Sequence, residues 1–279
     1  MKKVVVFGSS GMAGHMVYKY LESLGEYDLM GISRTIVPEI KSESFDIESD
    51  FEECIDYLDQ FKPDVIINCI GLLVKSCEED PTRAIFVNSM WPHALENICQ
   101  ESGARLIHIS SDCIFDGKQG PYTEQDWPTE KNWYGRTKSL GEVVNSKDLT
   151  IRTSIIGPEL KDDGVGLFGW FMRQSGDVSG FINVMWNGIT TLELAKQIHT
   201  ILGSNLAGLY HLVTEIPIAK GELLTHIQNI WAKTDVEIKP TSSVPSNKVL
   251  LNNRIGEYDP KIPMYAIQLE EMKDFYTSG

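Results

Sequence analysis

The chain has 279 residues, of which 42% are hydrophobic, and its 39 acidic and 25 basic side chains give a formal net charge of −14 at pH 7. This length can bury a large core and exceeds the usual size of one domain, so we expect a main domain with a smaller appended one. The acidic balance argues against a nucleic-acid partner, whose phosphates need a basic surface, but a locally positive cleft can still hold an anionic nucleotide.

The N-terminal segment predicts a strand, a tight turn and a helix. The apolar run at 4–7 precedes Gly8, and helical spacing of apolar residues follows Gly14. A Gly-x-x-Gly-x-x-Gly turn in this place lets the backbone approach a pyrophosphate at a helix N-terminus. The apolar run is too short for a signal peptide. We expect a dinucleotide cofactor on Gly8, Ser10, Gly11, Met12 and Gly14.

Apolar runs then alternate with amphipathic stretches of helical pattern. The runs that predict strands lie at 4–8, 27–33, 43–47, 64–71, 104–110 and 149–156. Such alternation is typical of a parallel sheet with helices on both faces. We therefore predict an α/β fold with a Rossmann-type, doubly wound parallel sheet.

The sequence changes character after Pro158, where a Gly-rich and aromatic stretch begins. A helix at about 191–203 is expected to return to the main domain. A strand at 209–213 and a helix at 220–233 are expected in a smaller C-terminal, mixed α/β lobe that binds substrate. We therefore divide the chain into an NAD(P)-binding Rossmann domain at 1–157 and a substrate-binding region at 158–279.

Cysteine usage and hydropathy bear on location. The five cysteines form no Cys-x-x-Cys pair, and their odd number leaves one unpaired in any disulfide scheme. The longest apolar run, at 65–74, contains Asn68 and is too short to cross a bilayer. We expect a reduced, cytoplasmic protein with no membrane partner. The six histidines show no metal-ligand spacing, so we expect no metal site.

Ser111, Tyr134 and Lys138 form the most informative pattern. A tyrosine four residues before a lysine places both side chains on one helix face, where the ammonium can stabilise the phenolate and lower its pKa. Ser111 follows a predicted strand, where its hydroxyl can polarise a carbonyl group. The tyrosine–lysine spacing alone is common on helix surfaces. The three residues together predict carbonyl reduction.

A longer set of motifs contains these residues. It consists of HISSDCIFDGKQGPYTEQDWPTEKNWYGRTKSLGE at 108–142, VIINCIG at 65–71, Asn88, IRTSIIGP at 151–158 and GITT at 188–191. In this set the chain resembles the extended short-chain dehydrogenase/reductases, and within them the dTDP-4-dehydrorhamnose reductase-like sugar-nucleotide reductases. The resemblance implies reduction of a nucleoside-diphosphate-linked 4-keto-6-deoxy sugar, in deoxysugar and surface polysaccharide biosynthesis, with Ser111, Tyr134 and Lys138 as catalytic residues.

The cofactor preference depends on the residue after the second strand. An acidic residue there suits the ribose hydroxyls of NAD, and a basic residue suits the 2′-phosphate of NADP. Arg34 stands there, so we expect NADP(H) to be preferred, although NAD(H) stays open because similar reductases use either. The resemblance adds contacts to the adenine, to the ribose and to the nicotinamide ribose, from Asp46, Ile47, Cys69, Ile70, Gly71, Tyr134 and Lys138.

Asp112 and Cys113 follow Ser111 and bear on the substrate. Related 4,6-dehydratases have a glutamate where this chain has Cys113, so dehydration is disfavoured. Reductases of the family often have tyrosine there, so this chain departs from them too. Aromatic rings can stack on a base or a sugar, and an arginine can bind a diphosphate. Packing in the core or exposure on the surface is an equal alternative for each further candidate: Trp170, Phe171, Arg173, Asn183, Trp186, Asn187 and Arg254.

Two other functions stay open. The regulatory β subunit of methionine adenosyltransferase shares the resemblance, so the chain can instead be a non-catalytic nucleotide-binding subunit, although the intact Ser111, Tyr134 and Lys138 weigh against this. A sugar-nucleotide epimerase is the other alternative. Because relatives commonly dimerise, a homodimer is a further expectation.

Overall fold

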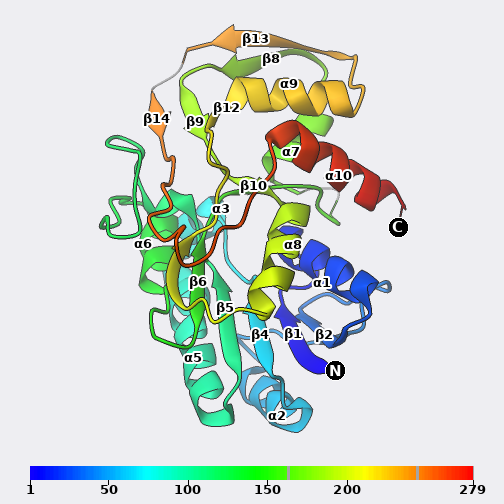
Figure 1. The fold of residues 1–279 in the computed structure, drawn as a ribbon, viewed down its shortest axis with the longest axis vertical. Helices are drawn as coiled ribbons and strands as arrows, with labels where there is room; N and C mark the ends of the chain where they lie inside the picture. The colour runs from blue at the N-terminus through cyan, green and yellow to red at the C-terminus, as the bar shows by residue number, and fades with distance from the viewer. Residues whose placement is uncertain (162–163, 243–244, 279) are drawn as a thin grey trace.

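The computed structural model describes residues 1–161, 164–242 and 245–278. It contains a parallel sheet and a smaller lobe beyond the carboxyl ends of the strands (Figure 1). Among these residues, seven strands form the main sheet in the order β11-β6-β5-β4-β1-β2-β3, and neighbouring strands are parallel. The predicted Rossmann-type sheet is therefore confirmed. The strands are β1 (Lys2–Phe7), β2 (Tyr27–Ser33), β3 (Ser42–Ser44), β4 (Val65–Asn68), β5 (Arg105–Ile109), β6 (Leu149–Arg152) and β11 (Gly208–His211).

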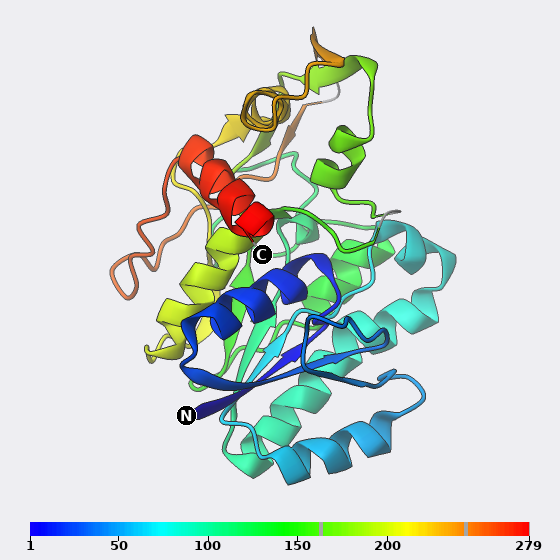
Figure 2. The same ribbon diagram turned by 90° about the vertical axis from the view of Figure 1, so that its right-hand side faces the viewer.

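Helices cover both faces of this sheet, as the alternation of patterns predicts. Because side chains alternate along a strand, Val4 and Val6 pack with α1 (Met12–Leu24) and α8 (Thr191–Leu202) on one face. Val5 and Phe7 pack with α2 (Phe51–Phe61) and α5 (Trp91–Ser102) on the other. Figure 2 shows α1 and α2 on opposite sides of the sheet. The connections that follow β4 and β5 contain α3 (Val74–Glu79), α4 (Pro81–Ile85), the π-helical turn η1 (Phe86–Met90), the 3-10 turn η2 (Asp112–Ile114) and α6 (Trp133–Leu140).

The lobe lies beyond the carboxyl ends of the main strands, at the top of Figure 1. It contains α7 (Leu167–Met172) and α9 (Lys220–Ile230), together with two small sheets. One has the order β12 (Ile218–Ala219), β9 (Val184–Trp186), β14 (Ser246–Asn247), and the other pairs β13 (Val236–Thr241) with β8 (Gly176–Phe181). The short pair β7 (Ile155–Ile156) and β10 (Ile189–Thr190) connects the lobe to the main sheet.

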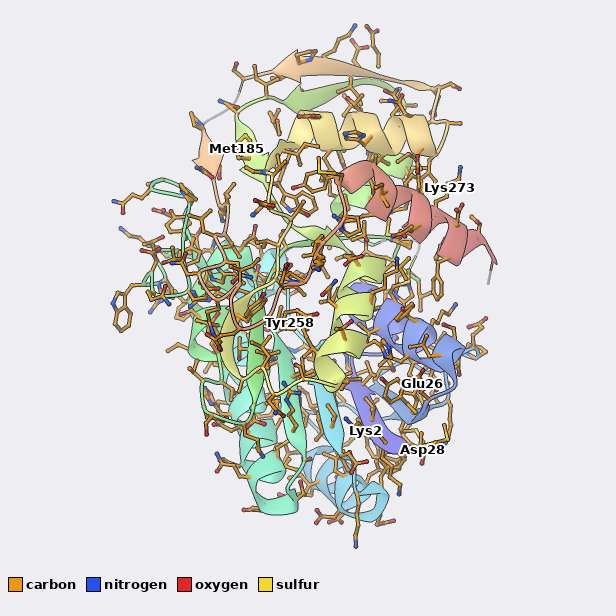
Figure 3. The ribbon with its side chains drawn as sticks, viewed as in Figure 1. Lys2, Glu26, Asp28, Met185, Tyr258 and Lys273 are labelled. Atoms are coloured by element: carbon orange, nitrogen blue, oxygen red, sulfur yellow. The ribbon has the colours of Figure 1, made fainter. Side chains whose placement is uncertain are left out.

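The C-terminal part of the chain returns to the main domain. The last helix, α10 (Tyr265–Ser278), packs on both α8 and α9, and Lys273 donates to the carbonyl oxygen of Ile230 at 2.8 Å. Before this helix, the hydroxyl of Tyr210 donates to the carbonyl of Tyr258 at 2.6 Å, and Tyr258 donates to Gln197 at 2.6 Å. Figure 3 labels Tyr258 and Lys273 among the side chains. None of the helices in the described ranges combines the length and the apolar character that a bilayer crossing requires.

Two expected strands differ from those observed. The strand at 209–213 is expected in the lobe, and this assignment is wrong, because β11 pairs in parallel with β6 and extends the main sheet. The boundary at 157 therefore does not separate two continuous domains. The strand expected at 43–47 is shorter, and Asp46 lies after β3, where its carbonyl accepts from the N–H groups of Ser49 and Asp50.

Candidate active site

The glycine-rich turn joins β1 directly to α1. Gly8 has φ of 76°, in the left-handed region that favours glycine, and its N–H donates to the carbonyl of Ile32 at 2.7 Å. A Cβ on Gly14 would collide with the carbonyl oxygen of Gly8, so only glycine permits this packing of helix on turn. Gly11 is exposed at the N-cap of α1 and brings no side chain over the first helical N–H groups. Half-buried Ser10 and Met12 flank Gly11, and the turn thus presents a helix N-terminus suited to an anion.

The ends of β2 and β3 lie next to this turn. Exposed Arg34 follows Ser33, the last residue of β2, and its carbonyl accepts from the hydroxyl of Ser44 at 3.2 Å. Asp46 accepts the N–H of Glu48 at 3.1 Å, and Ile47 is buried. A hollow of about 330 Å³ beside this loop is lined by Glu48, Asp80, Thr82, Arg83 and Phe86. No motif in the sequence points to Arg83, whose guanidinium pairs with Glu48 at 2.7 Å.

The loop after β4 links the glycine turn to Lys138. The N–H of Cys69 donates to the carbonyl of Phe7 at 3.0 Å, and a Cβ on Gly8 would stand 3.1 Å from the carbonyl carbon of Cys69. The N–H of Ile70 donates to Asn68 at 3.1 Å. In the next residue, a Cβ added to Gly71 would lie 3.7 Å from Nζ of Lys138. The glycine turn, the loop after β4 and the ammonium of Lys138 thus lie next to one another.

Ser111, Tyr134 and Lys138 meet at the carboxyl edge of the sheet. Ser111 follows β5, and its Oγ accepts the N–H of Cys113 at 3.0 Å. The side chain of Ser111 lies close enough to the phenol of Tyr134 to oppose, as a hydrogen-bond partner, the rise in its pKa. Lys138 lies one turn further along α6, and its Nζ donates to the carbonyl of Ile109 at 2.7 Å. The structure therefore brings together the three residues that the pattern predicts as catalytic.

Asn88 ties α6 to the neighbouring loop. It is buried in η1, its Oδ1 accepts the N–H of Leu72 at 2.8 Å, and its Nδ2 donates to Oγ1 of Thr137 at 3.2 Å. At the start of the same helix, Asn132 accepts the N–H of Gly135 at 2.8 Å, as an N-cap. Both contacts fix α6 and with it Tyr134.

Burial controls the protonation of the two residues on α6. It raises the pKa of Tyr134, and the nearby Cys113 raises it further. Burial also lowers the pKa of Lys138 to about 8, against the opposing effect of Glu142. The net shift in the pKa of the phenol is therefore upward, opposite to the lowering expected from Lys138, because burial has the largest effect. Tyr134 is a neutral phenol at neutral pH, which is the form that can donate a proton.

Asp112 and Cys113 lie beside the three candidate catalytic residues, Ser111, Tyr134 and Lys138. Asp112 is buried, and burial raises the pKa of its carboxyl while Lys248 and Lys220 oppose that shift. Cys113 is half-buried, and burial raises the pKa of its thiol to about 12, so the thiol stays protonated. The sequence patterns do not predict Lys248 near this site, because it lies 136 residues after Asp112 in a segment with no recognisable motif.

The remaining substrate candidates differ in exposure and in hydrogen bonding. Trp170 on α7 is 38% exposed, and Asn183 is half-buried between β8 and β9, so both are accessible on the lobe. Trp186 is only 6% exposed, packs against Tyr265 with ring centroids 5.7 Å apart, and donates to Ser154 at 2.8 Å. Phe171 is fully buried, and Asn187 is held by three backbone hydrogen bonds, so core packing accounts for these two, while Arg173 donates to the carbonyl of Gly164.

Arg254 lies away from the trio, so its expected place near the substrate diphosphate is corrected. Its guanidinium donates to the carbonyls of Ala207 and Leu209 and pairs with Glu257. These carbonyls lie at the amino end of β11, whereas Ser111 follows the carboxyl end of β5 in the same parallel sheet. Arg254 therefore lies toward the amino ends of the strands, away from the carboxyl ends where Ser111 lies.

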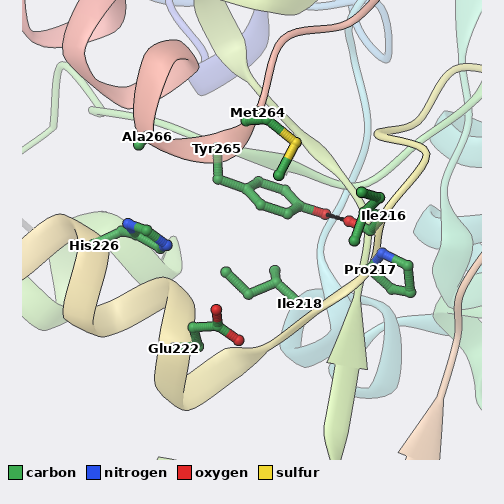
Figure 4. A pocket seen from close by; sticks show the side chains of 8 residues that line it. All are labelled: Ile216, Pro217, Ile218, Glu222, His226, Met264, Tyr265 and Ala266. Carbon is green, nitrogen blue, oxygen red and sulfur yellow. Dashed lines mark hydrogen bonds between the residues drawn. The ribbon is translucent and has the colours of Figure 1, made fainter.

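A separate pocket of about 160 Å³ lies in the lobe, between the start of α9 and the start of α10 (Figure 4). Its walls are largely apolar, with Glu222 and His226 along α9, and the hydroxyl of Tyr265 donates to the carbonyl of Ile216 at 2.8 Å. It contains none of the predicted site residues. Within the described ranges, no group of three or more His, Cys, Asp or Glu side chains could hold a metal ion.

Comparisons with known proteins place the chain in a family. Residues 1–249 match the family model described as the RmlD substrate binding domain. The chain is 28% identical over 229 residues to the probable low-salt glycan biosynthesis reductase Agl14 of Haloferax volcanii. This match covers 78% of the present chain and 76% of the relative. The chain is also 32% identical over 145 residues to methionine adenosyltransferase 2 subunit beta of Mus musculus, over 50% of this chain and 42% of that one.

Solved structures show the same fold. The crystal structure of a dTDP-4-dehydrorhamnose reductase from Bacillus anthracis str. Ames, in complex with NADP, superimposes with a TM-score of 0.81 over 98% of this chain and 99% of that one, at 20% sequence identity. The predicted resemblance to the dTDP-4-dehydrorhamnose reductase-like proteins, within the extended short-chain dehydrogenase/reductases, is thereby confirmed. The chain belongs to the family of the RmlD substrate binding domain.

Proposed function

We propose that this protein uses NAD(P)H to reduce a nucleoside-diphosphate-linked 4-keto-6-deoxy sugar, in the biosynthesis of a deoxysugar or a surface polysaccharide. The observation that carries the proposal is the placement of Ser111 beside Tyr134 at the carboxyl end of β5, with Lys138 one turn away on the same helix. Family membership and the printed activity of the Haloferax volcanii relative, a glycan biosynthesis reductase, support the same class of reaction.

The residues between the glycine turn and Lys138 fit a nicotinamide dinucleotide. The Gly8–Gly14 turn leaves a helix N-terminus open for the pyrophosphate, and Gly71 leaves space beside Lys138 that a side chain would fill. When bound, the cofactor supplies the hydride. Lys138 would hold its nicotinamide ribose. Arg34 would face the adenosine ribose, and its charge favours the 2′-phosphate of NADP over the free hydroxyl of NAD.

Ser111, Tyr134 and Lys138 would together stabilise the negative charge that develops on the carbonyl oxygen during reduction. In the proposed reaction the Ser111 hydroxyl turns from Asp112, to which it donates at 3.2 Å, and donates to that oxygen instead. Tyr134 gives its phenolic proton to the oxygen. The ammonium of Lys138 stabilises the phenolate that remains. Cys113, a protonated thiol, cannot replace the acidic residue that dehydration requires.

Substrate contacts are proposed from the residues around the same edge. Asp112 and Cys113 border Ser111, and Trp170 and Asn183 are the accessible candidates on the lobe. Trp186, whose indole N–H donates to Ser154, is also proposed as a substrate contact. A cytoplasmic location and a homodimer stay predictions.

A kinetic assay tests the proposal. Oxidation of NADPH and NADH is followed by absorbance with dTDP-, UDP- and GDP-linked 4-keto-6-deoxy sugars. We expect turnover of one of them, a preference for NADPH, and a loss of about 10²-fold or more in kcat for Tyr134→Phe. Absence of turnover with every sugar nucleotide, while NADPH still binds, would contradict the proposal.

One alternative has an observation in its favour. The similarity to methionine adenosyltransferase 2 subunit beta covers 50% of this chain, and a binding subunit needs the nucleotide site without the chemistry. In that case Tyr134→Phe would leave function intact. An epimerase, the other alternative, would retain its nicotinamide cofactor through purification.

A further inference from the structure

Lys248 lies beside the loop that carries Ser111, although the two are far apart in the sequence. A Cβ added to Gly117 would stand 3.1 Å from Cγ of Lys248, and the N–H of Asn247 donates to the carbonyl of Gly117 at 2.8 Å. The residues after β14 thus run along the loop at 111–122. This contact brings a cation from the C-terminal part of the chain to the edge of the candidate active site.

The ammonium of Lys248 lies near acidic groups of that loop and of the segment before α6. Its Nζ lies 3.5 Å from Oε2 of Glu130, and the two side chains are 22% and 18% exposed. Burial lowers the pKa of Lys248, but Cys113, Asp112 and Glu130 together outweigh that effect and raise it. Lys248 is therefore charged, and screening by solvent is reduced.

Glu130 connects Lys248 to the start of α6. Its other oxygen, Oε1, accepts the N–H of Lys131 at 2.8 Å and that of Asn132 at 3.3 Å. Asn132 is the N-cap of α6 and accepts the N–H of Gly135, the residue after Tyr134. Movement of Glu130 would therefore alter the first turn of the helix, on which the phenol is carried.

Asp112 connects Lys248 to Ser111. Among the charges that act on the buried carboxyl of Asp112, Lys248 has the largest effect. The hydroxyl of Ser111 donates to this carboxyl at 3.2 Å and also accepts the N–H of Cys113. A carboxylate that is not neutralised would hold the Ser111 proton more strongly, and the serine would then be less able to donate to a substrate oxygen.

We propose that Lys248 is a positioning residue, whose ammonium, paired with Glu130 and packed against the loop at 111–122, holds the two segments that carry Tyr134 and Ser111 in place. As a statement about catalysis, this inference rests on the proposed function. The inference adds a residue of the C-terminal region to a site whose proposed catalytic residues, Ser111, Tyr134 and Lys138, all come from the Rossmann part of the chain.

Hydrogen exchange measured by mass spectrometry tests the coupling without any substrate. The Lys248→Met protein, saturated with NADPH, should exchange about fivefold faster at 111–117 and at 130–138, as expected for loss of a partly buried ion pair. Lys248→Arg should restore most of the protection. Lys239→Met, which removes an exposed pair with Glu237 on β13, is the matched control and should leave both segments as in the wild type.

Steady-state kinetics tests the consequence for catalysis. With the sugar nucleotide that the wild type reduces, Lys248→Met should lower kcat about tenfold and change KM by less than about twofold, since it disturbs the reacting groups more than binding. Glu130→Gln combined with Lys248→Met should lower kcat by much less than the product of the two single effects, because both act through one contact.

The outcomes separate this inference from the proposed function. Unchanged exchange in both segments, or an equal loss of kcat in Lys248→Arg and Lys248→Met, would overturn the inference. If the wild type reduces no sugar nucleotide, the proposed function fails, and the exchange result alone decides whether Lys248 holds the two segments. Tyr134→Phe should abolish turnover but leave hydrogen exchange as in the wild type. This result distinguishes a loss of the reacting group from a loss of its positioning.

Discussion

Gly141, directly after α6, lies against the backbone of Asn88 in η1, so closely that a Cβ on Gly141 would collide with the carbonyl oxygen of Asn88. The side chain of Asn88 binds Thr137 of the same helix and the N–H of Leu72. Contact between α6 and η1 therefore fixes the axis of the helix that carries Tyr134 and Lys138. The π-helical turn supplies this contact through both its backbone and its side chain.

Gly141→Ala should destabilise the fold for this reason. Neither the helix end nor the carbonyl of Asn88 can yield easily, so we expect a loss of about 2 kcal/mol in the free energy of unfolding, as for overpacking in a core. Denaturant-induced unfolding followed by circular dichroism measures it. Gly256→Ala is the control, because its added methyl group would meet no atom within 4 Å. Equal stability of the two variants would show that the α6–η1 contact is not tight in solution.

The pKa of Lys138 predicts a limit on activity at high pH. Burial lowers this pKa to about 8, so the ammonium is lost as the pH rises through that value. The neutral amine can no longer stabilise the phenolate of Tyr134, and kcat/KM for reduction should fall above about pH 8. Tyr134 does not account for this fall, because burial raises its pKa and keeps it protonated.

Lys138→Arg separates this effect from a general loss of stability. A guanidinium stays charged over the whole range, so the slower variant should show no fall in kcat/KM near pH 8. Lys75→Met, at an exposed position on α3, should keep the wild-type profile. A profile for the wild type that is flat between about pH 7 and 9.5 would rule out a charged Lys138 as the group required.

The sequence predicts best those parts of the site whose residues are close along the chain. The glycine turn is one strand–turn–helix unit, and Tyr134 and Lys138 share one helix, so spacing alone places them. Ser111 could be added because strands of a parallel sheet end at the same edge. These residues come together as the pattern predicts.

Positions that depend on contacts between distant segments were not predictable. The strand at 209–213 has the same local pattern in a lobe or in the main sheet, and only its pairing with β6 decides. Arg254 was expected near a diphosphate, but its guanidinium caps the amino end of β11 instead. Lys248 meets the Ser111 loop only because the residues after β14 lie along it. No periodicity or motif records any of these three contacts.

Arg34 predicts how the protein discriminates between the two cofactors. Because Arg34 is exposed at the end of β2, its guanidinium is free to approach a 2′-phosphate, whereas NAD offers it only a hydroxyl. Arg34→Ala should raise the Kd for NADPH about tenfold or more and leave the Kd for NADH within about twofold. Fluorescence titration with each nucleotide measures both constants. An equal rise in the two would mean that Arg34 supports the loop and does not select the phosphate.

Acid should destabilise the protein through its buried histidines. Burial lowers the pKa of His211 to about 3, and burial also lowers that of His108 well below its usual value. As the pH falls below about 6.5, the unfolded chain binds protons at these positions while the folded chain does not. Stability is therefore lost as the pH falls from about 6.5 toward 3, with a slope that approaches about 1.4 kcal/mol per pH unit for each histidine.

His211→Gln tests the share of one residue in this loss. In the wild type, Nδ1 of His211 lies 2.9 Å from the carbonyl of Leu251, and a glutamine amide can still donate to it. The variant should be less stable at pH 7, because its packing is imperfect, but its free energy of unfolding should fall less steeply between about pH 6.5 and 5. Urea unfolding at a series of pH values gives both slopes. Parallel slopes would show that His211 already binds a proton in the folded protein within this range.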